Sequence, residues 1–303
     1  MRARTGPVVA LLAAASLVAA CSSSPGATPV VSTPAAPAAS AAAVASAAPV
    51  SGAPIFLGTQ EYPPGIQADV RLPAATGAAP LIVLVPGGGW QTADRSGLTP
   101  LAEALTIAGA TTANITYRTT ADGTTFPTPA EDVACAVRWA AQRATEEGRP
   151  PSRTIVAGHS AGGHLAALVA LSGDAFGSDC PAPPASIDGL VGIAGIYDPD
   201  GMEPVMEPLF GSSRGDQPDV WEKGSPIAWA ARDGLTPEGF RTLLIHGPGD
   251  TLVPAEQSLE LADALTGRGV DTLVEFVADG THQSVYQADV AAPLIQKWLD
   301  AWP

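Results

Sequence analysis

The chain has 303 residues, of which 15 are basic and 30 acidic, so its formal net charge at neutral pH is −15. Phosphate binding needs clustered Lys and Arg, and this composition therefore argues against a nucleic-acid partner. The four histidines are scattered and form no ligand pattern such as H-E-x-x-H, so the sequence predicts no metal ion and no cofactor.

The first 20 residues have the form of a secretory signal. Arg2 and Arg4 are positively charged, residues 7–18 are apolar, and residues 18–20 are small, as at a cleavage site. Cys21 follows directly, an arrangement that resembles the lipobox of bacterial lipoproteins. We therefore expect an exported protein, anchored through lipid on Cys21 to the outer face of the cytoplasmic membrane or to the cell envelope. A secreted protein with a stray cysteine and an uncleaved anchor helix are the alternatives.

Residues 21–53 contain almost only Ser, Ala, Pro, Gly, Thr and Val, with neither charge nor aromatic side chains. Such a segment buries too little surface to offset the entropy of ordering, so it is predicted to be a disordered linker. The remaining residues, 54–303, are sufficient for one large domain with a buried core.

Short apolar runs predict the strands of this domain. They lie at residues 81–85, 155–157, 190–194, 243–245 and 273–277. Most are continuously apolar, which is typical of parallel strands covered by helices on both faces. The predicted fold is therefore α/β, with a mostly parallel central sheet, and residues 198–231 look like a small cap excursion over the carboxyl edge of that sheet.

Helical segments lie between these strands. Thr99 and Pro100 open one helix, and Thr128 with Glu131 forms a predicted capping box at the start of another. A last helical stretch covers residues 290–299, in which we expect Pro293 to kink or restart the helix.

The stretch Gly-His-Ser-Ala-Gly at 158–162 follows an apolar run and precedes an alanine-rich helix. This is the pattern of a strand-turn-helix that exposes a serine at a sharp bend, so Ser160 is the candidate nucleophile. Gly158 and Gly162 lack a Cβ, which allows strand and helix to approach closely.

A serine hydroxyl needs backbone donors that stabilise the oxyanion it creates. Pro86 and then three glycines, at 87–89, follow the first apolar strand, and this run can turn free amides toward a developing negative charge. Gly88 and Gly89, together with the amide of Ala161 after the nucleophile, are the predicted oxyanion hole. A flexible turn is the simpler interpretation of three glycines.

A serine nucleophile also needs a base. His159 and His164 flank Ser160 too closely to reach it while accepting support from a carboxylate. His246 ends a strand, and we expect it to serve in local packing or hydrogen bonding. His282, in a loop after the last strand, is the predicted base.

An orienting carboxylate completes the set. Asp250 lies in the loop after the fourth predicted strand, and the chain order Ser160, Asp250, His282 is that of a Ser-Asp-His triad. Asp198 is a competitor, and Asp279 is too close in sequence to reach the far ring nitrogen of His282.

Two further predictions concern cysteines and aromatic residues. Cys135 and Cys180 form a predicted disulfide, since an oxidising compartment favours pairing; two separately buried thiols are the alternative. Trp90 and Tyr197 are candidate substrate contacts, and ordinary core positions are the alternative for both.

The segments that carry a family resemblance are Pro-Gly-Gly-Gly-Trp at 86–90, Pro-Ala-Glu-Asp at 129–132 with Arg-Trp at 138–139, Gly-His-Ser-Ala-Gly-Gly-His at 158–164, Ser-Pro-Ile at 225–227, His-Gly at 246–247, Asp250 and His282. From about residue 80 to its end the chain resembles the α/β-hydrolase superfamily, in particular the bacterial esterase/lipase group related to hormone-sensitive lipase and to BD-FAE-type carboxylesterases. One departure is Pro86, where such enzymes commonly have histidine before the glycines. This difference affects the expected geometry of the loop and the expected shape of the acyl pocket.

The leading functional hypothesis is a serine carboxylester hydrolase that cleaves short-chain or acetyl esters through an acyl-enzyme, with a small-molecule ester as substrate. Cleavage of an amide or peptide, such as an arylformamide, on the same triad is one alternative. A non-catalytic, lipid-anchored envelope protein is the other.

Overall fold

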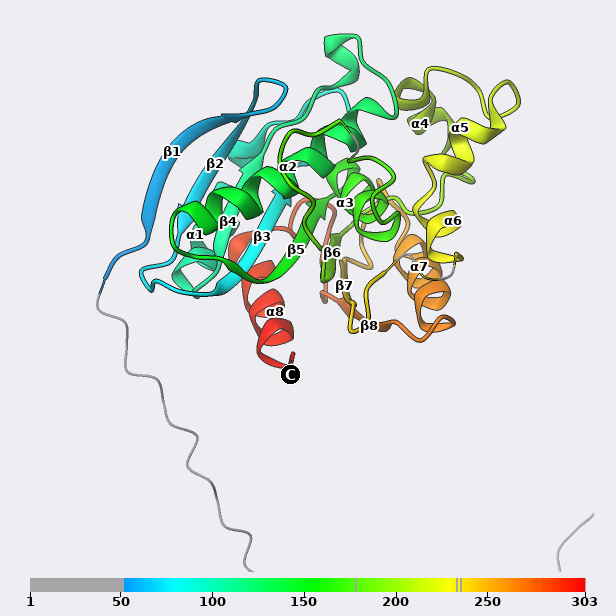
Figure 1. Cartoon of the computed structure of the whole chain (residues 1–303). Coiled ribbons are helices and arrows are strands. Elements are labelled where there is room, and N and C mark those ends of the chain that lie inside the picture. Colours follow the sequence, from blue (N-terminus) through cyan, green and yellow to red (C-terminus); the bar gives the residue numbers. More distant parts are fainter. Residues whose placement is uncertain (1–51, 178, 233, 235, 303) are drawn as a thin grey trace, which may run out of the picture. The chain divides into compact units, whose positions relative to one another are not determined.

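The computed structural model describes residues 52–177, 179–232, 234 and 236–302 (Figure 1). The predicted signal, Cys21 and most of the predicted linker lie outside the described residues. Among the helices of the described part, none combines the length and the apolar character needed to cross a membrane.

Eight strands form one sheet in the order β1-β2-β4-β3-β5-β6-β7-β8. Their bounds are β1 Ile55–Tyr62, β2 Ile66–Leu72, β3 Ala79–Val85, β4 Thr111–Ile115, β5 Pro151–His159, β6 Gly189–Ile193, β7 Arg241–His246 and β8 Asp271–Phe276. Strand β2 runs antiparallel to β1 and β4, and the other neighbours are parallel. The five predicted apolar runs are β3, β5, β6, β7 and β8, so the predicted mostly parallel α/β fold is confirmed.

Strands β1, β2 and β4 were not predicted because they carry no continuous apolar run. Strand β1 is largely solvent-accessible, and β4 is buried although its sequence is polar. In β4 the hydroxyl of Thr112 lies 2.9 Å from that of Thr106, and the side-chain amide of Asn114 donates to the carbonyl of Arg95 at 2.6 Å. These tertiary hydrogen bonds offset the burial of polar groups, which hydropathy alone does not reveal.

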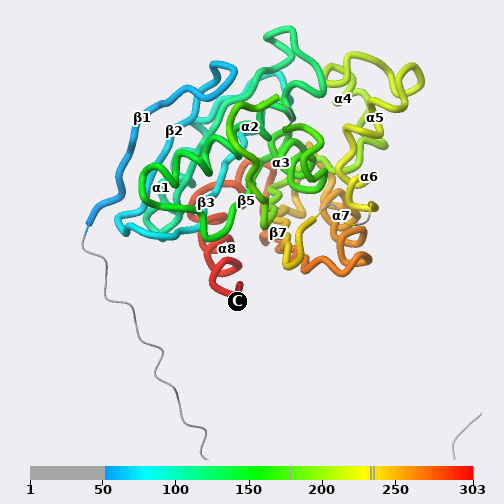
Figure 2. Tube along the Cα trace, in the orientation of Figure 1, coloured from blue at the N-terminus to red at the C-terminus, as the bar shows by residue number. Residues whose placement is uncertain are grey.

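Helices cover both faces of the sheet. Helices α1 (Thr99–Ile107) and α8 (Ala288–Asp300) pack on one face, whereas α2 (Thr128–Glu146), α3 (Ala161–Leu171) and α7 (Glu256–Thr266) pack on the other. In β3 the side chains of Leu81 and Val83 join the core under α2 and α3, and those of Ile82 and Leu84 join the core under α1 and α8. This alternation explains why every position of β3 is apolar. Figure 2 traces the chain from the blue β1–β2 hairpin at one side to the orange α7 at the other.

The structure corrects the predicted start of one helix and excludes a predicted restart in another. Pro127, not Thr128, is the N-cap of α2, and no side chain caps the helix, because a turn that begins at Thr125 already places Thr128 in helical backbone. Helix α8 also does not restart at Pro293 but continues through it to Asp300. Its face with Ile295 and Trp298 is buried against the sheet, and this packing outweighs the hydrogen bond that proline cannot donate.

The excursion at residues 198–231 contains helices α4 (Glu203–Phe210), α5 (Pro218–Lys223) and α6 (Pro226–Ala230), of which α4 and α5 lie at the upper right of Figure 1. Its large apolar side chains pack inward: Phe210 and Trp221 are almost fully buried, with ring centroids 4.5 Å apart. The short 3-10 helices η1 (Arg95–Leu98) and η2 (Thr120–Asp122) complete the described helices.

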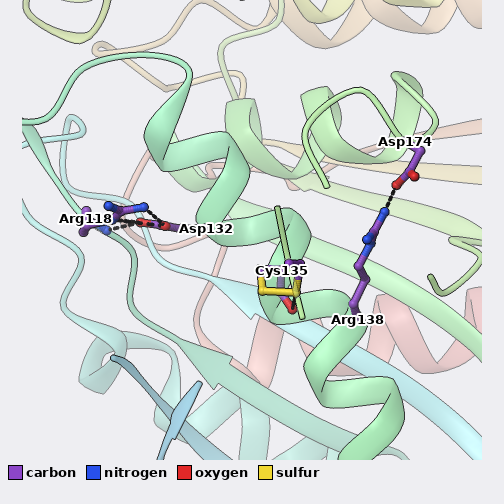
Figure 3. Close-up of a disulfide and its surroundings, with 6 residues drawn as sticks. Arg118, Asp132, Cys135, Arg138 and Asp174 are labelled. Atoms are coloured by element: carbon purple, nitrogen blue, oxygen red, sulfur yellow. Dashed lines mark hydrogen bonds and ion pairs between the residues drawn. A yellow bond between two sulfur atoms is a disulfide. The ribbon is translucent and has the colours of Figure 1, made fainter. Parts of the chain in front are cut away.

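Cys135 of α2 and Cys180 in the loop after α3 form a disulfide, as predicted (Figure 3). Arg138, one turn further along α2, pairs with Asp174 of the same loop. Helix α2 is therefore tied twice to the segment that follows α3.

Candidate active site

The loops at the carboxyl ends of β3, β5, β7 and β8 meet at one edge of the sheet. They carry the glycine run after Val85, Ser160, Asp250 and His282. Parallel strands bring their carboxyl ends together, so residues more than 100 positions apart in sequence become neighbours at this edge.

Ser160 lies between β5 and α3 in a strained backbone conformation, with φ 54° and ψ −122°. Its amide donates to the carbonyl of Ile193 at 2.9 Å. A Cβ at Gly158 would overlap the carbonyl of Gly162, and one at Gly163 would press on the backbone of Gly195. Glycine is therefore required where strand and helix cross, and the serine is presented at the bend.

The three candidate triad residues form one chain of hydrogen bonds. His282 Nε2 lies 2.9 Å from Ser160 Oγ, and His282 Nδ1 lies 2.7 Å from Asp250 Oδ2. A carboxylate only accepts, so Nδ1 carries the proton and Nε2 is free to accept from the serine hydroxyl. This arrangement can remove the serine proton as Oγ attacks.

The carboxylate of Asp250 is held from its second oxygen as well. Oδ1 accepts from the amides of Leu252 at 2.8 Å and Val253 at 2.9 Å. Burial raises the pKa of Asp250, but the hydrogen bonds from Val253, His282 and Leu252 outweigh it and hold the pKa below its usual value. The group is thus an anion at neutral pH, as an orienting acid must be.

His159 contacts the candidate base, although the sequence indicated no role for it. Its Nε2 donates to the backbone carbonyl of His282 at 2.9 Å, and its ring centroid lies 4.7 Å from that of His282 and 4.2 Å from that of Tyr286. Burial, and then the neighbouring His282, lower the pKa of His159 to about 4, so this ring is neutral. The side chain before the serine therefore holds the loop of His282 in place.

The glycine run has the backbone freedom that the sequence suggested. Gly88 and Gly89 have φ of 135° and 57°, and Trp90 also has a positive φ of 57°. Gly87 lies against the nucleophile, since a Cβ on it would be 3.1 Å from Ser160 Cβ. Within the described part of the chain, the amides of Gly88, Gly89 and Ala161 have no protein acceptor. These donors remain available to an oxyanion.

The other candidates lie elsewhere. His164 is buried and hydrogen-bonded to the carbonyl of Gly224, and Asp279 is exposed in a turn. The amide of Asp198 donates to Gln257 at 2.8 Å, and its carboxylate accepts from the amide of Asp200.

Trp90 and Tyr197 are 1% and 0% exposed, and Trp90 packs edge-on to His164. Both side chains lie in the hydrophobic core, as the alternative interpretation expected, and a role in substrate contact stays a prediction.

His246 is hydrogen-bonded locally, as expected, but it also approaches Asp250: Nε2 lies 3.3 Å from Oδ2. This contact was not predicted, and the four-residue spacing between the two residues was the only sequence signal for it. Among the described residues, no cluster of three or more His, Cys, Asp or Glu side chains is arranged to hold a metal ion.

A mostly parallel sheet with a serine at a strand-turn-helix bend, followed by Asp and His on later strand-end loops, defines the α/β-hydrolase fold. The sequence model of the BD-FAE family matches residues 68–265, and the chain belongs to this family.

Among its relatives, the chain is 30% identical over 197 residues to the probable carboxylic ester hydrolase LipM of Mycobacterium tuberculosis, covering 63% of this chain and 46% of LipM. It is 29% identical over 206 residues to esterase LipQ of the same organism, covering 64% and 48%. A truncated carbohydrate esterase from gut microbiota superposes with a TM-score of 0.71 at 21% identity, covering 81% of this chain and 95% of that chain. The chain spans about half the length of the curated relatives, and the likeness to the solved structure shows the fold.

Proposed function

We propose that this protein is a serine carboxylester hydrolase that cleaves short-chain or acetyl esters through an acyl-enzyme, with Ser160, His282 and Asp250 as its triad. The observation that carries the proposal is the unbroken hydrogen-bonded series from Ser160 Oγ through His282 to Asp250. The family and the names of the relatives support ester hydrolysis.

In the first half-reaction Ser160 Oγ attacks the carbonyl carbon of the ester, while His282 Nε2 takes the hydroxyl proton. Asp250 stabilises the imidazolium that forms and holds Nδ1–H in place. The tetrahedral intermediate collapses as the C–O bond of the ester breaks, and His282 returns the proton to the departing alcohol. The acyl group remains on Ser160.

In the second half-reaction a water molecule takes the place of the alcohol. His282 removes one of its protons, the hydroxide equivalent attacks the acyl carbon, and the bond to Ser160 Oγ breaks with return of the proton. A carboxylic acid leaves. In both steps the carbonyl oxygen becomes negative, and the unpaired amides of Gly88, Gly89 and Ala161 are the donors proposed to stabilise it.

Hydrolysis of p-nitrophenyl acetate by the wild type and by Ser160→Ala tests the proposal. We expect the substitution to reduce kcat by about 10⁴-fold or more, because removal of the nucleophile leaves only residual catalysis by binding and oxyanion stabilisation. Equal rates in the two proteins would exclude the proposed mechanism. Rapid-quench kinetics should also show a burst of p-nitrophenol equal to the enzyme concentration if the acyl-enzyme accumulates.

The preference for short acyl groups is part of the proposal, and esters of graded acyl length test it. Trp90 and Tyr197, the predicted substrate contacts, are buried: Tyr197 packs over Gly192 and Gly195, and Trp90 packs on His164. We expect kcat/KM to fall from acetate to butyrate to octanoate p-nitrophenyl esters. A matched acetanilide should react far more slowly, and equal rates on ester and anilide would indicate an amidase.

For the cellular setting we propose export and lipid anchoring through Cys21, which rests on the sequence pattern of the first 21 residues. Metabolic labelling of the producing cells with a fatty acid should mark the wild type and leave Cys21→Ser unmarked. Labelling of both proteins, or of neither, would contradict the anchor.

A further inference from the structure

His246 is fully buried at the end of β7, four residues before the proposed triad acid. Its Nε2 lies 3.1 Å from the carbonyl oxygen of Val253 and 3.3 Å from Asp250 Oδ2, which is the same oxygen that accepts from His282. Val253 in turn donates its amide to the other oxygen of Asp250. One imidazole edge therefore contacts both the carboxylate and the turn that holds it.

The chemistry of these neighbours determines the tautomer of His246. A carbonyl and a carboxylate are both acceptors, so an unprotonated Nε2 between them would be repelled by both, and Nε2 must carry a proton. On the other side of the ring, Nδ1 lies 2.8 Å from the hydroxyl of Ser258 in α7. A hydroxyl can donate or accept, so Ser258 donates to the bare Nδ1 and completes the arrangement.

A neutral ring is the consistent state at this position. Burial lowers the pKa of His246, which outweighs the opposite effects of its hydrogen bond to Val253 and of the charge on Asp250; His282 lowers the pKa further. A neutral Nε2–H donor can hold the carboxylate without neutralising the charge that His282 needs.

We propose that His246 is a positioning residue of the active site: in its neutral, Nε2-protonated tautomer, selected by Ser258, it fixes the Asp250–Val253 turn and the carboxylate that orients His282. This inference rests on the proposed function. A loosened carboxylate would misalign the imidazole with Ser160 and slow the chemical step. Because His246 is fully buried and presents no surface to a substrate, KM should be unchanged.

Nuclear magnetic resonance of the wild type tests the tautomer directly. Long-range proton–nitrogen correlations of the labelled protein resolve the ring nitrogens, and only four histidines are present. His246→Gln identifies the His246 signals by their loss. We expect a protonated Nε2 and a bare Nδ1 at neutral pH, and the opposite tautomer would overturn the proposal.

The kinetics of two variants at position 246 test the positioning role of His246. His246→Leu removes the donor at similar volume, and we expect kcat to fall about 10- to 100-fold with KM within about twofold. His246→Gln keeps an amide donor near the position of Nε2, and it should recover at least a tenth of the wild-type kcat. Wild-type kcat in folded His246→Leu would overturn the proposal, as would a rise in KM at constant kcat or a Gln variant as slow as the Leu variant.

Thr106→Val is the matched control, because it removes the buried hydrogen bonds of the Thr106 hydroxyl to the carbonyl of Ala102 and to the hydroxyl of Thr112, away from the triad. It should retain full kcat below its melting temperature, and circular dichroism would report whether each variant is folded. If His246→Leu fails to fold, the tautomer measurement and the Gln variant still decide the matter. Failure of the proposed function can be told apart from failure of the His246 proposal, since the wild type and Ser160→Ala would then hydrolyse the ester equally.

Discussion

Removal of the disulfide between Cys135 and Cys180 should destabilise the fold without slowing catalysis. The two residues are 45 positions apart, and the chain-entropy relation for a cross-linked loop of that length gives about 13 cal/mol/K, or about 4 kcal/mol at room temperature. The double variant Cys135→Ala/Cys180→Ala avoids a lone reactive thiol. Alanine is also a good helix former, so the effect in α2 should come from the lost cross-link.

Urea unfolding followed by circular dichroism measures this effect. With a slope of about 3 kcal/mol per M of urea, a loss of about 4 kcal/mol lowers the midpoint by about 1.3 M. The ion pair between Arg138 and Asp174 still joins α2 to the same loop, so the native structure and kcat should persist. A midpoint lowered by less than about 0.3 M would refute the entropic reasoning, because it corresponds to a loss of only about 1 kcal/mol. Reduced and alkylated wild type should unfold like the double variant.

Three further outcomes are expected. Gly162→Ala forces a Cβ onto two carbonyls at the end of β3, so it should abolish hydrolysis and lower the free energy of unfolding by about 1–3 kcal/mol. In Gly97→Ala the new Cβ meets open space, so thermal and urea unfolding should give a free energy within about 0.5 kcal/mol of the wild type. Asp250→Asn removes the charge that orients the base and should lower kcat for p-nitrophenyl acetate by about 10⁴-fold; a loss below about tenfold would contradict its role. Burial lowers the pKa of His159 and His164 to about 4. Below about pH 6.5 the unfolded chain binds protons that the native protein does not, so the free energy of unfolding should fall between about pH 6.5 and 4 by up to about 3 kcal/mol per histidine. Urea unfolding across that range should show a smaller pH slope for His164→Gln, and an identical slope would exclude the assignment.

Features encoded in neighbouring residues could be predicted from the sequence. Five strands follow from continuous apolar runs, because a strand covered on both faces has no polar side. The bend at Ser160 follows from glycines at 158 and 162, since only residues without a Cβ fit there. The order of Ser160, Asp250 and His282 predicted a set that the folded chain indeed brings within hydrogen-bond distance.

Other features escaped prediction because their cause lies in residues distant along the chain. Strand β4 is held by hydrogen bonds from Thr112 and Asn114 to α1 and η1, so its polar sequence carries no strand signal of its own. The N-cap of α2 was mispredicted for a local reason instead: the turn that begins at Thr125 already supplies helical backbone at Thr128, so Pro127 is the N-cap.

The sequence by itself determined five of the strands, the bend at Ser160 and the chemical groups that follow each of these strands, since apolar runs, glycine positions and residue types are local properties. Only the tertiary structure decided which groups the buried histidines contact. His159 contacts a carbonyl 123 positions away, His282 contacts a serine 122 positions away, and His246 depends on a hydroxyl supplied by α7. Imidazole can donate, accept or pack, and the partner that selects among these is set by the packing of strands and helices, not by the adjacent sequence.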